Sequence, residues 1–277
     1  MLSQLNIQCA ADQHDKVCEL KRVLSEDPIN WKKFLELDEE LAVLSHQDDF
    51  DCSITWILSH YPPGYVIHTL LERYHNEVFA NQEQMKKVLN IGLVSSIPEV
   101  VQFICSHYPY VLSQRLDEET GDYPIHRAQK MEIASIILAA DPASIGYQNN
   151  KLDLPLHCAL YHQQHPDHVN LLLERGLAMH TGGDEGKGGV LVPNRNGKTP
   201  FDILKGQFQC MDLATITSPI YEADRRLWQN FVSMICVIRG VNPLQAREMN
   251  LLHAIIELDC PPQAVRLGQI MTGQTGY

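Results

Sequence analysis

The sequence predicts an all-α protein, a solenoid of stacked helical hairpins with two insertions. Three observations favour this fold class. An apolar segment recurs along the chain, an element with a proline and a histidine alternates with it, and each apolar segment has helical spacing and ends at a proline. Proline ends a helix because it disfavours the α conformation in the preceding residue and donates no backbone hydrogen bond.

The apolar segment is clearest in two copies, residues 54–62 and 101–109. They align without gaps at an offset of 47 residues, and both end in Ser-His-Tyr-Pro. A weaker copy, residues 134–142, follows 33 residues later and ends in Asp-Pro. Each copy is predicted to be a helix that ends before its proline, with His60 and His107 as C-terminal residues of the first two helices.

The alternating element reads Tyr-Pro-Ile-His-Arg-Ala at 123–128 and Leu-Pro-Leu-His-Cys-Ala at 154–159. Related segments occur at 199–204 and 250–255. The histidine position therefore holds His126, His157, Asp202 and His253, at steps of 31, 45 and 51 residues. In the last copy the histidine directly precedes its alanine, whereas one residue separates the histidine and the alanine in the first two copies.

This element resembles the ankyrin signature T-P-L-H-x-A, which belongs to a 33-residue repeat. Asn-Gly-Lys-Thr-Pro at 196–200 is similar to the turn that enters such a repeat, and the segments 251–254 and 260–262 resemble the degenerate ankyrin repeats of algal proteins. The resemblance implies that the proline opens a first helix. It also implies that the histidine bonds backbone in the turn between repeats, and that the alanine keeps the first helix thin enough to stack.

The sequence indicates four regions. They are an N-terminal helical cap (1–34), ankyrin-like repeats (35–206), a long helical insertion (207–248) and a C-terminal degenerate repeat or cap (249–277). Within the repeats, five glycines among residues 181–189 predict a flexible surface insertion. In the second insertion, Ser218 and Pro219 are predicted to start a long amphipathic helix that runs to about Arg239.

Composition and charge argue against several functional classes. The chain has 277 residues and a net charge of −12. Duplex nucleic acid is therefore an unfavourable partner, because proteins that bind it neutralise its phosphates with clustered Lys and Arg. No apolar run is long enough to predict a membrane span, and the N-terminus lacks the pattern of a signal peptide. The eight cysteines are scattered singly, as in proteins of reducing compartments, so a cytoplasmic or nuclear location is expected.

Motifs for catalysis or metal binding are weak. The glycine-rich residues 182–189 and the Gly-Lys-Thr of 197–199 each lack part of a phosphate-binding P-loop. Histidines 157, 162, 165 and 168, with Cys158, have a spacing that suits zinc in part. However, the repeat signature already assigns His157, and the acidic runs are interpreted as solvated surface. No cofactor, no metal and no enzymatic activity are expected.

The resemblance implies a non-enzymatic protein–protein interaction scaffold that presents a concave binding surface, without a large entropic cost on association. The candidate partner-binding residues are Arg127, Lys130, Tyr161 and His162 on inner helices, and Glu118, Glu119, Asn150, Lys151, Asn194 and Arg195 at turn tips. The negative net charge favours a partner with a basic surface. Two alternatives stay open: a structural subunit of a larger assembly, and a His-rich metal-binding protein or enzyme. The chain is expected to be a monomer or a subunit of a hetero-assembly.

Overall fold

The computed structural model describes residues 22–23, 30, 32–33, 36, 64–78, 82–212, 216, 221–241 and 251–273. In this part of the chain every regular element is a helix: there are eleven α-helices and four short 3-10 helices, and there is no strand. The predicted all-α class is therefore confirmed. None of these helices is long and apolar enough to cross a membrane. The chain divides into two compact units, Met1–Ile104 and Cys105–Tyr277.

In the first unit the described helices are α4 (Gly64–Val78), α5 (Gln82–Val94) and the greater part of α6 (Pro98–His107). A tight turn joins α5 to α6, in which the Ile97 N–H donates to the Gly92 carbonyl at 2.8 Å. A Cβ on Gly92 would lie 2.9 Å from Val100, so glycine permits this close packing. His107 ends α6 as predicted, whereas His60 lies outside the described residues.

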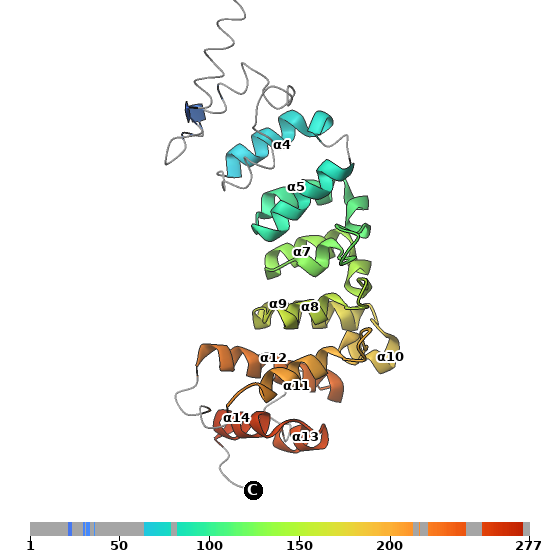
Figure 1. Cartoon of the computed structure of the whole chain (residues 1–277), viewed down its shortest axis with the longest axis vertical. Helices are drawn as coiled ribbons and strands as arrows, with labels where there is room; N and C mark the ends of the chain where they lie inside the picture. The colour runs from blue at the N-terminus through green and yellow to red at the C-terminus, as the bar shows by residue number, and fades with distance from the viewer. Residues whose placement is uncertain are drawn as a thin grey trace, which may run out of the picture. The chain divides into compact units, whose positions relative to one another are not determined.

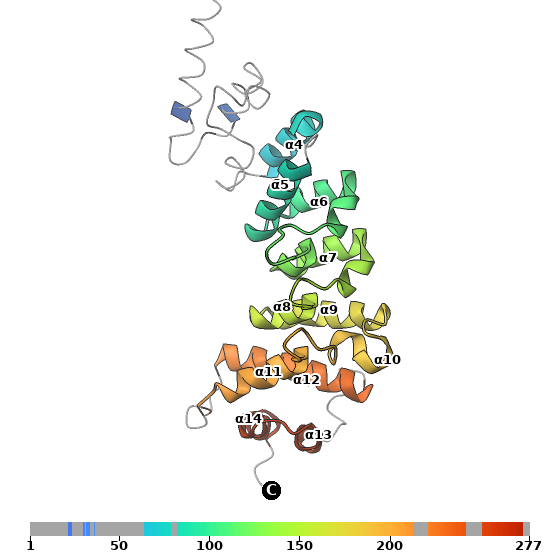
Figure 2. The same ribbon diagram turned by 45° about the vertical axis from the view of Figure 1, so that its right-hand side comes forward.

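The second unit contains four pairs of helices. The pairs are η3 (Pro124–Arg127) with α7 (Met131–Ala140), α8 (Pro155–Tyr161) with α9 (Pro166–Ala178), α11 (Pro200–Gln209) with α12 (Glu222–Arg239), and α13 (Leu251–Glu257) with α14 (Pro262–Thr272). Two further 3-10 helices are η2 (Pro109–Ser113) and η4 (Pro142–Gly146). Figures 1 and 2 show the pairs of this unit in successive layers.

Each layer of the second unit packs on its neighbours through both helices. The helix α8 contacts η3 on one side and α11 on the other, and α9 contacts α7 and α12 in the same way. Apolar residues of the second helices lie in this interior, since Ile133 and Ile137 of α7 and Val169 and Leu172 of α9 are buried. The core is therefore continuous from layer to layer.

Proline begins the first helix in three of these pairs. Pro124, Pro155 and Pro200 each occupy the first helical turn, where a backbone N–H has no partner within the helix. The buried alanines Ala128 and Ala159 follow, as expected of thin first helices. These starts agree with the sequence pattern.

The glycine-rich residues 181–189 are partly at the surface, as predicted, since residues 182–185 and 187 are exposed, but the rest of the segment is packed against the protein. They form two short helical turns, α10 (Gly183–Gly186) and η5 (Lys187–Gly189), and η5 packs against α9. Gly188 and Gly189 are buried. A Cβ on Gly176 of α9 would lie only 2.2 Å from the carbonyl oxygen of Gly188. Glycine here permits two backbones to touch, and composition alone does not distinguish that role from flexibility.

The predicted long helix also has a different role. The helix α12 ends at Arg239 as predicted, with Gly240 in the left-handed conformation after it, but its first residue is Glu222. Ser218 and Pro219 lie outside the described residues. Because α12 packs against α11 and α9, it is the second helix of a pair rather than an insertion. The predicted boundary at residues 206–207 falls inside α11.

Candidate interaction surface

Three turns of the second unit share one backbone pattern. They span residues 116–123, 147–154 and 192–199, and each leads into a helix that starts with proline. The residue three positions before that proline has a positive φ in every turn: 67° at Gly121, 59° at Leu152 and 71° at Gly197. The turns therefore repeat in structure at the spacing that the sequence elements indicate.

An asparagine ties the second turn to the first and another ties the third turn to the second. Asn149 and Asn194 occupy equivalent positions, and the side-chain oxygen of each accepts two backbone N–H groups of its own turn. The Nδ2 of Asn149 donates to Asp122 at 2.9 Å, and the Nδ2 of Asn194 donates to Asp153 at 2.7 Å. Both amides thus use their oxygen and their nitrogen for hydrogen bonds inside the row of turns.

Histidine forms the second tie. The Nδ1 atoms of His126 and His157 accept the backbone N–H that precedes each helix, at 3.2 and 3.0 Å. Their Nε2 atoms therefore carry the proton, and they lie 2.9 and 3.2 Å from the carbonyl oxygens of Asp153 and Lys198 in the following turn. Histidine bonds backbone between turns, as expected. Burial lowers the pKa of both rings, although these backbone hydrogen bonds oppose the effect.

The fourth copy of the element does not repeat this arrangement. His253 lies within α13, with 65% of its side chain exposed, and it contacts Glu257 of the same helix at 3.0 Å. At the third copy, Asp202 takes the histidine position, and its Oδ2 accepts the Thr199 backbone N–H at 3.0 Å. The tie to a following turn is therefore seen at His126 and His157.

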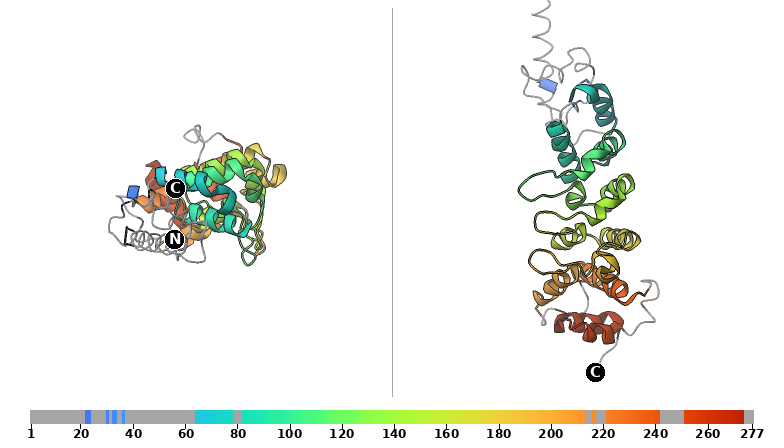
Figure 3. Two further views of the ribbon diagram at one scale, coloured as in Figure 1. Left: turned by 90° about the horizontal axis from the view of Figure 1, so that it is seen from above. Right: turned by 90° about the vertical axis from the view of Figure 1, so that its right-hand side faces the viewer.

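These ties place the predicted turn-tip residues side by side. Asn150 Nδ2 donates to the carbonyls of Glu118 and Glu119 at 2.9 and 3.0 Å. The Arg195 N–H donates to the Lys151 carbonyl at 2.8 Å. The side chains of Glu118, Glu119, Lys151 and Arg195 are exposed. Figure 3 shows the turns projecting on one side of the helix layers of this unit.

Arg127 has a structural role that the sequence analysis did not predict. Its guanidinium pairs with Asp117, and its Nε lies 3.4 Å from Asp122. Partial burial tends to raise the pKa of Asp117. Hydrogen bonds from Thr120 and the charge of Arg127 lower it by more, so the pKa of Asp117 is below its usual value. Arg127 therefore braces the first turn and is not an unengaged cation for a partner.

Asn194 is buried, with 6% of its surface exposed, so its assignment as a partner-binding residue is wrong. Its amide also contacts the Tyr161 hydroxyl at 3.2 Å, and Tyr161 itself is 47% exposed. Lys130 and His162 are exposed, but they follow η3 and α8 at the ends away from the turns. The structure therefore brings Tyr161, but not Lys130 or His162, to the turn tips.

Leu152 is a candidate residue that the sequence analysis missed. Leu152 is 41% exposed at the tip of the second turn. Its backbone is left-handed, and the equivalent positions of the other two turns, which share this conformation, are the glycines Gly121 and Gly197. This conformation costs a leucine about 1–2 kcal/mol. The signal in the sequence is the spacing, because all three residues stand three positions before a proline. The turn-tip surface consists of six residues: Glu118, Glu119, Lys151, Leu152, Tyr161 and Arg195.

Replacing Leu152 by glycine is expected to raise the free energy of unfolding by about 1 kcal/mol, because the backbone strain disappears. Gly197→Ala is the matched reverse change. No atom lies within 4 Å of a Cβ at Gly197, so this change adds backbone strain alone and is expected to lower stability by about 1 kcal/mol. Urea denaturation measures both. If the Leu152→Gly variant were less stable than the parent protein, the backbone of Leu152 would not be strained.

The histidine cluster does not form a metal centre in the described residues, where no group of three or more His, Cys, Asp or Glu side chains is placed to hold a metal ion. The His157 ring lies between two turns, His165 caps α9 by accepting from the Asp167 N–H, and His168 is buried in α9.

Burial raises the pKa of the Cys105 thiol to about 12 and that of Cys260 to about 11, so both thiols stay protonated near neutral pH.

Similarity to known proteins adds nothing to this picture. No protein-family model matches the chain, and no similar protein was found among curated proteins or solved structures. The geometry of the turns and of the turn-tip surface is therefore the basis on which a function is proposed.

Proposed function

We propose that the second unit is an ankyrin-like helical-hairpin solenoid that binds another protein through the turn-tip surface and catalyses no reaction. Two features support this architecture. The helix pairs pack in successive layers, and the same asparagine and histidine ties recur at equivalent positions of successive turns. Each layer packs on the next one along the chain, which is the arrangement of repeat proteins.

The exposed and strained Leu152 is the observation that carries the proposed binding function. Burial of the exposed part of this leucine by a partner contributes favourable free energy, whereas its left-handed backbone conformation costs stability in the isolated chain. Such strain persists in proteins at functional sites. Lys151 precedes Leu152, and the Lys151 carbonyl is bonded to Arg195, so the apolar side chain lies in a polar rim.

Rigid turns favour binding for a second reason. Glu118, Glu119 and Asn150 are joined by side-chain hydrogen bonds, and Arg195 is joined to Lys151 through the backbone. The loops that present the turn-tip surface are therefore ordered before a partner arrives. Association then loses little conformational entropy, so a modest contact area suffices for specific binding.

The test uses two double variants of the full chain. The variant Lys151→Ala/Leu152→Gly alters the turn-tip surface, and the control Glu174→Ala/Arg175→Ala alters exposed residues of α9. The unmodified protein is used to capture a partner from an extract of its source cells, and the partner is identified and purified. Titration calorimetry then measures the dissociation constant of each variant for that partner.

The turn-tip variant is expected to bind at least about tenfold more weakly, because a leucine anchor is removed without loss of stability. The α9 control is expected to bind as the unmodified protein does. Equal affinity of all three proteins would contradict the proposal, and so would loss of binding in the α9 control alone.

A further inference from the structure

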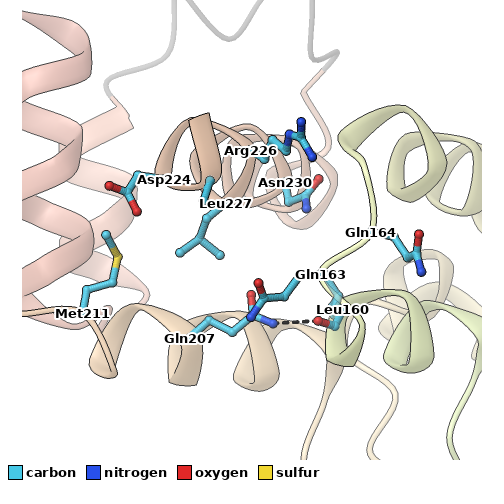
Figure 4. Close-up of a pocket in the computed structure, with 10 residues that line it drawn as sticks. Leu160, Gln163, Gln164, Gln207, Met211, Asp224, Arg226, Leu227 and Asn230 are labelled. Atoms are coloured by element: carbon cyan, nitrogen blue, oxygen red, sulfur yellow. Dashed lines mark hydrogen bonds between the residues drawn. The ribbon is translucent and has the colours of Figure 1, made fainter. Parts of the chain in front are cut away.

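A small pocket lies at the C-terminal end of α8. It has a volume of about 250 Å³ and lies between the residues that follow α8, the C-terminal end of α11 and the N-terminal half of α12. Leu160, Met211 and Leu227 supply its apolar wall (Figure 4). Small-molecule sites usually measure about 300–1,000 Å³, so this pocket suits one long side chain better than a cofactor.

Asn230 gives the pocket an unsatisfied polar group. The residue is 4% exposed and lines the pocket from α12, and its Oδ1 has no hydrogen-bond partner. A buried polar atom without a partner costs about 1–3 kcal/mol. Rotation of the amide exchanges its oxygen and nitrogen, so either atom can turn toward an occupant of the pocket. A ligand that bonds this amide recovers part of that cost.

Hydrogen-bond acceptors gather around the same space. Gln207 Nε2 donates to the Leu160 carbonyl at 2.6 Å, which leaves the Gln207 side-chain oxygen to accept from a ligand (Figure 4). Gln163 and Gln164 line the pocket from the loop after α8 and add two further amides. The polar lining is thus dominated by amide groups from three segments of the second unit.

Two residues of opposite charge, Asp224 and Arg226, line the pocket. Asp224 forms no ion pair within the described part of the chain. Arg226 also lines the pocket, and its Nε pairs with Glu222 of the same helix at 3.2 Å. Asp224 is therefore the one lining charge that has no counter-ion among the described residues, and it favours a cationic occupant.

We propose that this pocket binds an arginine side chain of a partner protein. The planar guanidinium has five N–H donors, which match a carboxylate and several amide oxygens at once. The head of the arginine pairs with Asp224, and its aliphatic stem contacts the apolar wall formed by Leu160, Met211 and Leu227. The net charge of −12 steers basic partners toward the protein. This site does not depend on the turn-tip surface.

The experiment titrates the full-length, isotope-labelled protein with three blocked tripeptides, Ac-Gly-X-Gly-NH₂, in which X is arginine, lysine or the neutral arginine analogue citrulline. NMR follows the side-chain amide signals of Asn230 and Gln207. The arginine peptide is expected to shift both signals in a saturable manner, with a dissociation constant of about 1 mM. The lysine and citrulline peptides are expected to bind at least about tenfold more weakly, since lysine lacks the planar fork and citrulline lacks the charge.

Two variants locate the binding energy. Asp224→Asn removes the carboxylate that has no counter-ion and is expected to weaken arginine binding about tenfold. Asp184→Asn, which removes an exposed carboxylate on α10, is the matched control and is expected to leave binding unchanged. The backbone spectrum of each variant verifies that it is folded.

Three results would overturn the proposal: equal binding of the arginine and citrulline peptides, no shift of the Asn230 and Gln207 signals, or unchanged arginine binding in folded Asp224→Asn. A glutamate tripeptide that binds in place of the arginine peptide would also overturn it, because Arg226 would then be the binding charge. None of these results bears on the turn-tip surface, so the two proposals stand or fall separately.

Discussion

Gly176→Ala is expected to lower the free energy of unfolding by about 3 kcal/mol, a large effect for one methyl group. Gly176 is a buried residue in α9, and its added Cβ would meet the carbonyl oxygen of Gly188 at 2.2 Å. Backbone atoms on both sides of this contact cannot rotate away as a side chain does. The helix α9 and the turn η5 must therefore separate, which disturbs the contact between them. Urea denaturation followed by circular dichroism measures the loss.

Gly206→Ala is the matched control for this prediction. Gly206 also lies inside a helix, α11, but no atom is within 4 Å of the position its Cβ would take. Alanine has the higher helix propensity, so this change is expected to raise stability by about 0.5–1 kcal/mol. Equal effects of the two substitutions would show that the glycine contact in α9 does not constrain the fold.

Acidification is expected to destabilise the protein between about pH 6.5 and pH 4, with His168 contributing about 3 kcal/mol. Burial in α9 lowers the pKa of His168 from 6.5 to about 4. Between these pH values the unfolded chain binds a proton that the folded chain excludes. The contribution of His168 is therefore complete above its unfolded pKa and is lost as the pH falls toward the folded pKa. His126 and His157 act in the same direction, since burial lowers their pKa values also.

The variant His168→Leu isolates this residue. His168 is 2% exposed and its Nδ1 has no hydrogen-bond partner, so leucine fills the space without leaving that ring atom unsatisfied. The variant is expected to lose about 3 kcal/mol less stability than the parent protein over the same pH range. His162→Leu, at an exposed position, is expected to follow the parent protein. Unfolding midpoints at pH 7, 5.5 and 4 compare the three, and parallel curves for all of them would contradict the assignment.

Much of the fold was predictable because it depends on local properties of the chain. Pro124, Pro155 and Pro200 begin helices because proline suits the first helical turn, and His107 and Arg239 end helices where the pattern places those ends. Part of the candidate surface was predictable for the same reason. Glu118, Glu119, Lys151 and Arg195 are exposed because polar turn residues generally face water.

The sequence by itself determined the all-α class, the starts of three helices and the backbone-bonding role of His126 and His157. Only the tertiary structure decided the roles of Asn194, Gly176 and Asn230. The reason is the distance along the chain at which their partners lie. Asn194 is buried because its amide reaches Asp153, 41 residues away, and Asn230 borders a pocket shared with segments before and after α11. Helical periodicity and turn chemistry describe neighbours within a few residues, whereas such contacts exist only once the layers have stacked.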